Sequence, residues 1–582
     1  MARCRSGHRK TVSERGGSKM KGAANIGWVK RQRPQECPRQ CGRRRRSSLK
    51  DICLGPFSLP AAVLGLQTES SGEAMGRVFS GLLLTLVLAV LVVPLALYAG
   101  PPILASFARE QPQRQLVVPS YQQAPATLSS GQDEFPVPAN LGSPLPDTDV
   151  LGDLLDAELV VPGSGEFHGA VVDALTGEVL YDLDGGAAAT PASSLKILTA
   201  AAALSVLGAD TRFDTTVYEG NTPGTVVLAG GGDVLLGSGE SEEDAVVGHA
   251  GLQNLAEDTA AALAKRNVSG TVSILVDDTL FSGDTLSPAW SEEDVEAGEA
   301  AALYPLAVNS AWAVEGQQSG ARVDDAALAA GDAFAAALQS AAASYGFEVD
   351  PEVTRGTAGD GADPLAAVSS ATVSEQVRQM LLVSDNYLAE ALGRMTALKT
   401  GGEGSFEDAA AAVESAVSGL GVDAAGMELA DVSGLGSGTG ISALQLAQTV
   451  RAALTSADNS VRGLPRSLPV AGLSGTLASR FTEATFPGPA AGSGADPADP
   501  ENGTANGTES GTAPPDQTPV AGLVRAKTGT LFAATSLTGF VTDADGRLLS
   551  FAFVANGLDG NTVQAREAVD AAAAVLAGCG CR

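Results

Sequence analysis

The sequence predicts an α+β (α/β) protein in which a central antiparallel sheet is flanked by helices. Two hairpin patterns and two helix patterns predict this fold. Residues 169–183 and 536–557 each place alternating apolar residues on both sides of a turn signal, which is typical of a β-hairpin. Helix-forming runs follow the hairpins, at 195–207 and at about 562–576. Because these pairs lie near opposite ends of the folded part, we expect one sheet built from both ends and covered by the middle of the chain.

Turn residues and helix-forming residues in the sequence account for each of these elements. The turn of the first hairpin is Thr176-Gly177, and that of the second is Asp545-Gly546. The run LKILTAAAALSVL (195–207) consists largely of strong helix formers, and Pro191-Ala192-Ser193 before it marks an N-terminal boundary.

Composition limits the classes of function. The 582 residues are 44% apolar, enough for two or three domains but not for a polytopic membrane protein. Lys and Arg number 37 against 67 Asp and Glu, a net charge of −30. Since an acidic surface repels phosphate, we expect no nucleic acid partner.

Histidine and cysteine are too scarce for several kinds of site. The histidines are His8, His168 and His249, and no cysteine occurs between Cys53 and Cys579. A cysteine nucleophile, a zinc site and a disulfide scaffold are therefore poor interpretations, and we expect neither a metal nor a cofactor. The tail pair Cys579 and Cys581 allows either a local disulfide or two thiols.

An uncharged apolar run at 78–99 has about the 20 residues needed to cross a bilayer. It is predicted to be either a cleaved signal peptide or a single membrane anchor. Basic residues before it, Arg77 among them, place its N-terminal side in the cytoplasm, so the remainder is exported. Residues 1–77 are then either a basic cytoplasmic tail or a spurious upstream extension, because Met75-Gly76-Arg77 would itself begin a secretory signal.

Two stretches of low complexity separate or interrupt the folded parts. Residues 100–150 include a Pro- and Gln-rich run that is typical of an extended linker. Residues 484–519 are rich in Pro, Gly, Ala and Asp and are predicted to be a disordered surface insertion.

Ser193 and Lys196 are the first candidates for chemistry. Three residues apart at a helix start, they project from one face, one turn apart. A serine hydroxyl needs a base to become a nucleophile, and no histidine is suitably placed in the sequence. Lysine serves if its pKa falls towards neutrality. Taken alone, the pattern is more often a surface serine near a surface lysine.

Two further motifs accompany this pair. Ser384-Asp385-Asn386 follows an amphipathic stretch, and Lys527-Thr528-Gly529 lies on an alternating, strand-like run. Only four lysines follow Lys50, and these motifs include two of them. The order Ser-x-x-Lys, Ser-x-Asn, Lys-Thr-Gly is that of a penicilloyl-serine site.

With these motifs, residues 150–577 resemble the D-alanyl-D-alanine carboxypeptidase/endopeptidase family of low-molecular-mass penicillin-binding proteins, the DacB-like branch. The segments LPVAGLSGTLASRF (468–481) and VRAKTGTLFAATSLTGFV (524–541) are similar to family segments and stand in family order.

The resemblance implies a serine β-lactamase/DD-transpeptidase-like fold with the following domains. A penicillin-binding catalytic domain would occupy 151–213 and 366–577, with inserted material at 214–365 and a tail at 578–582.

The resemblance also implies a role for each motif residue. Ser193 would attack the carbonyl of the penultimate D-Ala, Lys196 would take its proton, and Ser384 would pass a proton to the departing nitrogen. Substrate would be bound by the other motif residues: Asn386 at the substrate amide, Lys527 and Thr528 at the leaving carboxylate, and the backbone N–H groups of Ser193 and Thr530 at the acyl oxygen. Gly529 would be the remaining substrate-binding residue of the third motif.

Recognition of the peptide stem is a separate expectation. Asp277, in ILVDDTLF (274–281), is similar in position to a family aspartate that contacts the amine of the stem's diamino acid; the alternative is a turn aspartate. Family members often carry an Arg after Ser-Gly-Leu-Ser, whereas this chain has Gly436-Ser437.

The expected partners are peptidoglycan stem peptides and β-lactams, with transfer of the acyl group from Ser193 to water. Two rivals remain open: a serine β-lactamase or esterase of the same fold, and a non-catalytic cell-wall-binding protein.

Overall fold

The computed structural model describes residues 142–359, 361–482 and 520–581. The predicted membrane segment 78–99 and the predicted insertion 484–519 lie outside the described residues, as does most of the predicted linker. None of the helices in the described ranges is long and apolar enough to cross a bilayer.

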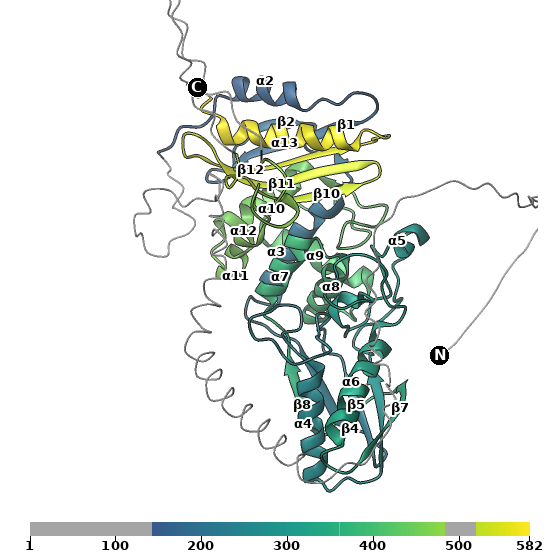
Figure 1. The fold of residues 1–582 in the computed structure, drawn as a ribbon. Coiled ribbons are helices and arrows are strands. Elements are labelled where there is room, and N and C mark those ends of the chain that lie inside the picture. The colour runs from purple at the N-terminus through teal and green to yellow at the C-terminus, as the bar shows by residue number, and fades with distance from the viewer. Residues whose placement is uncertain (1–141, 360, 483–519, 582) are drawn as a thin grey trace, which may run out of the picture. The chain divides into compact units, whose positions relative to one another are not determined.

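The first sheet has the strand order β10-β11-β12-β1-β2, and every neighbouring pair is antiparallel. It therefore joins the two ends of the folded chain, as predicted (Figure 1). Both predicted hairpins are present, β1 with β2 and β11 with β12. The strands are β1 (Glu166–Asp173), β2 (Val179–Leu183), β10 (Arg525–Leu531), β11 (Ala534–Thr542) and β12 (Leu548–Asn556).

Helices cover both faces of this sheet because successive side chains of a strand point to opposite faces. Val171 of β1 packs in one core with α2 (Thr148–Glu158) and α13 (Thr562–Gly578). Its neighbours Ala170 and Val172 pack in another core with α3 (Lys196–Val206) and α10 (Ala443–Thr455). Figure 1 shows α2 and α13 on one side of the sheet and α10 and α3 on the other.

Three further helices extend the α3 side. They are α7 (Val373–Val383), α8 (Asn386–Thr400) and α9 (Phe406–Gly419). Residues of α3, α7 and α8 share a core with the segment around Leu303. Two short helices, α11 (Asn459–Arg462) and α12 (Leu464–Ser467), follow α10.

Five strands between residues 214 and 369 form a second sheet, with the strand order β7-β6-β5-β4-β8. The pairs β5–β6 and β6–β7 are parallel, and α4 and α6 make their crossovers. The two helices and the sheet share one hydrophobic core, and this core contains Leu255, Phe334 and Val276. The elements are β4 (Asp214–Glu219), β5 (Thr225–Ala229), α4 (Leu252–Lys265), β6 (Thr271–Asp277), α6 (Ala326–Ala342), β7 (Glu348–Arg355) and β8 (Pro364–Ser369).

A buried ion pair also connects the two ends of the chain. The guanidinium of Arg547, in the β11–β12 turn, donates to both carboxylate oxygens of Asp173 at the end of β1, at 2.6 and 2.7 Å. At the C-terminal side of α13, Cys579 and Cys581 form a disulfide, the first of the two alternatives for this pair.

Candidate active site

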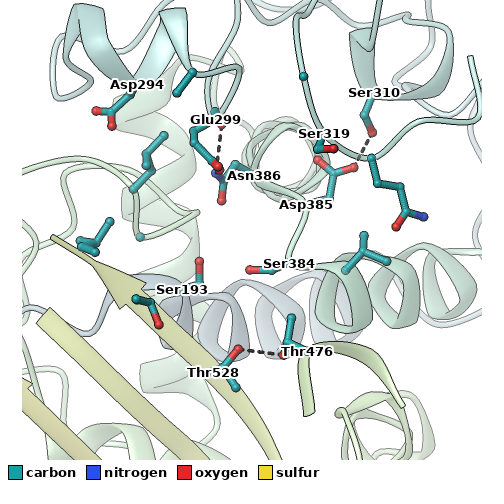
Figure 2. Close-up of a pocket in the computed structure, with 18 of the residues that line it drawn as sticks. Ser193, Asp294, Glu299, Ser310, Ser319, Ser384, Asp385, Asn386, Thr476 and Thr528 are labelled. Atoms are coloured by element: carbon teal, nitrogen blue, oxygen red, sulfur yellow. Dashed lines mark hydrogen bonds between the residues drawn. The ribbon is translucent and has the colours of Figure 1, made fainter. Parts of the chain in front are cut away.

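The three motifs lie around one pocket of about 910 Å³. Ser193, Ser384, Asn386, Thr528 and Thr530 all line it. Figure 2 shows Ser193 and Ser384 near its centre, with Thr528 on one side and Asn386 on the other. Among the described residues, no group of three or more His, Cys, Asp or Glu side chains is arranged to hold a metal ion.

Ser193 lies in a 3-10 turn (Ala192–Leu195) that continues directly into α3. Ala192 enters the turn with φ 49°, in the left-handed region that residues with a Cβ rarely adopt. One helical turn after Ser193, the Nζ of Lys196 donates to the Oγ of Ser193 at 3.1 Å. The hydroxyl and the amine that the sequence placed on one face are thus in direct contact.

Lys196 is completely buried. Its Nζ also donates to Asn386 Oδ1 at 2.6 Å and to the carbonyl oxygen of Ser433 at 2.7 Å. Burial lowers the pKa of this lysine to about 8, against an opposing effect of carboxylates, of which Asp431 and Glu390 contribute most. The amine is therefore close to the point at which it can accept a proton at neutral pH.

Ser384 and Asn386 lie at the junction of two helices. Ser384 ends α7 with φ 61°, and Asp385 caps the start of α8 by accepting from the N–H of Leu388. This sharp turn brings Ser384 to the Nζ of Lys527, which donates to its Oγ at 2.9 Å. Asn386, in the first turn of α8, reaches Lys196 instead.

Lys527 on β10 is the second buried lysine of the site. Besides Ser384, its Nζ donates to the carbonyl oxygen of Thr528 at 2.7 Å. Burial holds the pKa of Lys527 well below its usual range, and the charges of Lys196 and Arg480 lower it further. A bound anion would reverse this effect because it would offset the cost of burying an ammonium.

The remaining residues of the third motif lie along the edge strand β10. Thr528 donates its hydroxyl to Thr476 Oγ1 at 2.8 Å, and both residues line the pocket (Figure 2). Thr530 is exposed at the pocket. Gly529 passes so close to the turn before Ser193 that a Cβ would lie 2.6 Å from the carbonyl oxygen of Pro191 and would overlap Ser536.

Asp277 is not among the residues that line this pocket. It ends β6 in the second sheet, and its carboxylate accepts from the N–H and the hydroxyl of Thr279 and from the N–H of Ala358. These contacts match the alternative of a turn aspartate. Two other acids, Asp294 and Glu299, line the pocket, and in Figure 2 they lie on the opposite side of Ser193 from Thr528.

Sequence reasoning missed several pocket residues. Thr476 and Arg480 lie in the segment 468–481, for which the resemblance was noted without a role. Arg480 is held by an ion pair with Asp570 of α13. Arg322, also in the lining, stacks on the ring of Trp312 at 3.7 Å. No local pattern in the sequence distinguishes Thr476, Arg480 and Arg322 from other polar residues.

The fold and the site together define a penicillin-recognising serine hydrolase: an antiparallel sheet between helical layers, with a serine-lysine pair at a helix start beside the edge strand. Penicillin-binding protein 4 (DacB) of Haemophilus influenzae has this fold, with a TM-score of 0.52 and 19% identity over 72% of this chain and 97% of that chain. The chain belongs to the D-Ala-D-Ala carboxypeptidase 3 (S13) family, which matches residues 153–314 and 310–577. The predicted family is thus confirmed.

Relatives of known name agree with this membership. Carboxypeptidase DacB of Mycolicibacterium smegmatis is 35% identical over 459 residues, which cover 78% of this chain and 90% of the relative. The D-alanyl-D-alanine carboxypeptidase of Actinomadura sp. (strain R39) is 31% identical over 487 residues, covering 70% of this chain and 81% of the relative.

Replacing Gly529 by alanine should move β10 away from Ser193, because the added methyl group overlaps Ser536 and approaches the carbonyl of Pro191. We expect the rate of labelling by a fluorescent penicillin to fall about 100-fold, the cost typical of misplacing a reacting group by about 1 Å. Gly186→Ala is the matched control, since its added Cβ meets nothing within 4 Å. Labelling of Gly529→Ala at the unaltered rate would contradict the proposed dependence on this close approach.

Proposed function

We propose that Ser193 is the nucleophile with which this serine-type D-Ala-D-Ala carboxypeptidase forms an acyl-enzyme with peptidoglycan stem peptides. The reaction removes the terminal D-Ala or cuts a D,D-crosslink, and β-lactams acylate the same hydroxyl. The observation that carries the proposal is the 3.1 Å contact between the Ser193 hydroxyl and the completely buried amine of Lys196.

Acylation begins when Ser193 Oγ bonds to the carbonyl carbon of the penultimate D-Ala and its proton passes to the neutral amine of Lys196. The carbonyl oxygen takes the negative charge, and the backbone N–H groups of Ser193 and Thr530 are proposed to stabilise it. When the C–N bond breaks, the nitrogen needs a proton. The Ser384 hydroxyl, bonded to Lys527, is proposed to relay it. Water then attacks the ester, which frees the shortened stem and restores the serine.

Substrate binding is proposed to use the other motif residues. The Asn386 side chain is suited to a substrate amide, and Lys527 and Thr528 to the terminal carboxylate. Because burial lowers the pKa of Lys527, a carboxylate that enters the pocket would draw a proton onto this amine. The charge would thus appear together with the bound substrate.

The family acts on peptidoglycan, so the enzyme works outside the cytoplasm. The apolar run at 78–99 supports export and is proposed to be either a cleaved signal or a single membrane anchor.

Ser193→Ala should abolish labelling by fluorescent penicillin and the release of D-Ala, because the acyl-enzyme cannot form. The measurement is mass spectrometry of stem peptides from purified cell wall treated with each protein, which also separates carboxypeptidase from endopeptidase products. Ser205→Ala is the control: it lies on the same helix, and its hydroxyl bonds only to a carbonyl of that helix, Ala202.

Unchanged labelling of Ser193→Ala would refute the assignment. Rapid turnover of nitrocefin, in place of a long-lived adduct, would instead favour the rival β-lactamase.

The acylation rate should rise with pH. Only the neutral amine of Lys196 accepts the Ser193 proton, and burial sets its pKa at about 8. The second-order rate of acylation should therefore increase about tenfold per pH unit below that value and level off above it. Lys196→Arg keeps the charge but cannot act as a base, so its rate should be about 100- to 10,000-fold lower across the range. A profile that is flat from pH 6 to 9 would show that another group is the base.

Recognition of the stem's amino group is proposed to depend on Asp294 and not on Asp277, since only Asp294 lines the pocket. Asp294→Asn should raise KM about fivefold to tenfold, the loss of roughly 1 to 1.4 kcal/mol of ionic attraction, for peptides with a free side-chain amine. KM for N-acetylated peptides should stay unchanged. Asp277→Asn is the comparison, and an effect confined to that variant would restore the expectation from the sequence.

A further inference from the structure

Residues 282–304 of the segment between α3 and α7, here termed the strap, lie across α8 and the loop 431–437. Several hydrogen bonds hold the strap in place. The guanidinium of Arg394 on α8 donates to the carbonyl oxygens of Ser282 and Asp284, at 3.2 and 2.7 Å. Tyr387, also on α8, donates its hydroxyl to the carbonyl oxygen of Ala302 at 3.1 Å.

The strap contacts the loop as closely as it contacts the helix. The N–H of Ser437 donates to the carbonyl oxygen of Ala289 at 3.0 Å. A Cβ on Gly436 would lie 2.8 Å from that of Ala289. Gly436 stands where family members often have a serine, so the departure noted in the sequence permits this close packing.

Two partners of the catalytic amine are each oriented by the strap. The first is Asn386, whose Nδ2 donates to the carbonyl oxygen of Glu299 at 2.9 Å. With the Nδ2 turned to the strap, the opposite end of the amide, Oδ1, faces Lys196 Nζ at 2.6 Å. The contact fixes which way the side-chain amide is flipped.

The second partner is the carbonyl oxygen of Ser433. Its loop is held by the buried carboxylate of Asp431, which accepts from the hydroxyl of Ser433 and from the N–H groups of Gly434, Leu435 and Gly436. From the strap, the indole Nε1–H of Trp290 donates to the same carboxylate at 3.0 Å.

We infer that the strap is a positioning element of the acylation site and that Trp290 acts through Asp431 on the catalytic amine of Lys196. Trp290 does not line the pocket and touches none of the reacting atoms. The inference rests on the proposed function of Ser193 and Lys196 and adds to it a contribution from the inserted part of the chain.

The charges around Lys196 determine whether losing the hydrogen bond from Trp290 stabilises the ammonium form or the neutral form of this lysine. Four acidic side chains face it: Asp431 from the loop, Asp385 from the α7–α8 junction, Glu299 from the strap and Glu390 from α8. Burial raises the pKa of Glu390 itself to about 8. A second buried lysine, Lys527 of β10, lies nearby, and its pKa is held well below its usual range by burial and by Lys196. A hydrogen bond from Trp290 draws negative charge away from Asp431 and so weakens its attraction for a proton on Lys196. Without the indole N–H, Asp431 keeps four donors but more of its negative charge acts on Lys196, so the ammonium form of Lys196 gains stability.

The test is the pH dependence of acylation by a β-lactam in Trp290→Phe, which keeps an aromatic ring against Phe406. The pH at which the acylation rate reaches half of its maximum should move up by about 0.5 to 1 pH unit, so that the acylation rate at pH 7 falls about threefold to tenfold. At pH 9 the rate should stay within about twofold of the unaltered enzyme, because at least about half of Lys196 is then neutral in both proteins. A role in folding alone would lower the rate equally at every pH.

Phe406→Leu is the control for packing. It removes the ring that Trp290 meets at 5.2 Å but leaves the indole N–H, so thermal stability should fall while the midpoint stays. If Trp290→Phe does not fold, benzothienylalanine at position 290 replaces the N–H by sulfur at almost constant shape. If the midpoint is unchanged in Trp290→Phe or in the benzothienylalanine protein, and Ser193→Ala is still unlabelled, the inference alone is overturned. Labelling of Ser193→Ala overturns the proposed function as well.

Discussion

The contact between Ser193 and the buried amine of Lys196 is the interaction on which the site depends. An ammonium group is costly to bury, and the surroundings relieve that cost only in part: two oxygen acceptors and several carboxylates oppose the effect of burial without cancelling it. The result is an amine that can give up and regain a proton near neutrality. A better compensated lysine would be a poor base, and a fully apolar pocket would not hold it in place.

Burial also lowers the pKa of the second lysine of the site. Lys527 is buried beside Ser384 on the strand that borders the pocket, and Lys196 lowers its pKa further. Since two ammonium groups in one small buried volume repel each other, their protonation is coupled. In the proposed mechanism, protons pass within the pairs Ser193–Lys196 and Ser384–Lys527, so no histidine is required.

Much of the fold was predictable because it follows from local patterns. Alternating apolar residues around Gly177 and Gly546 predicted the two hairpins, and the run after Ser193 predicted α3. The fold family came from the motifs and their resemblance and not from periodicity. The parallel pairing in the second sheet was not predicted, since two crossovers through α4 and α6 leave no short-range pattern in the sequence.

The candidate site was predictable to the same degree. The motif residues could be named from the sequence because each motif is short: the first lies at a helix start, the second at a junction of two helices and the third on a strand. A role for Asp277 in binding the stem was expected only from a resemblance, beside the alternative of a turn aspartate, and a resemblance of one short segment does not reveal which surface the side chain faces. The bond from Trp290 to Asp431 joins residues 141 positions apart, and nothing local in either segment indicates it. Contacts of this kind depend on how the inserted part packs, which only the folded chain reveals.

The pairing of β1 with β12 has a consequence for when the enzyme becomes active. Glu166 of β1 is paired with Asn556 of β12, so the middle strands of the central sheet cannot pair until residue 556 has been synthesised. The strand that carries Lys527 is also made long after the helix that carries Ser193. A ribosome-bound or partly exported chain therefore has no working centre, and hydrolysis of the wall begins only after the last strands have reached the compartment in which the chain folds.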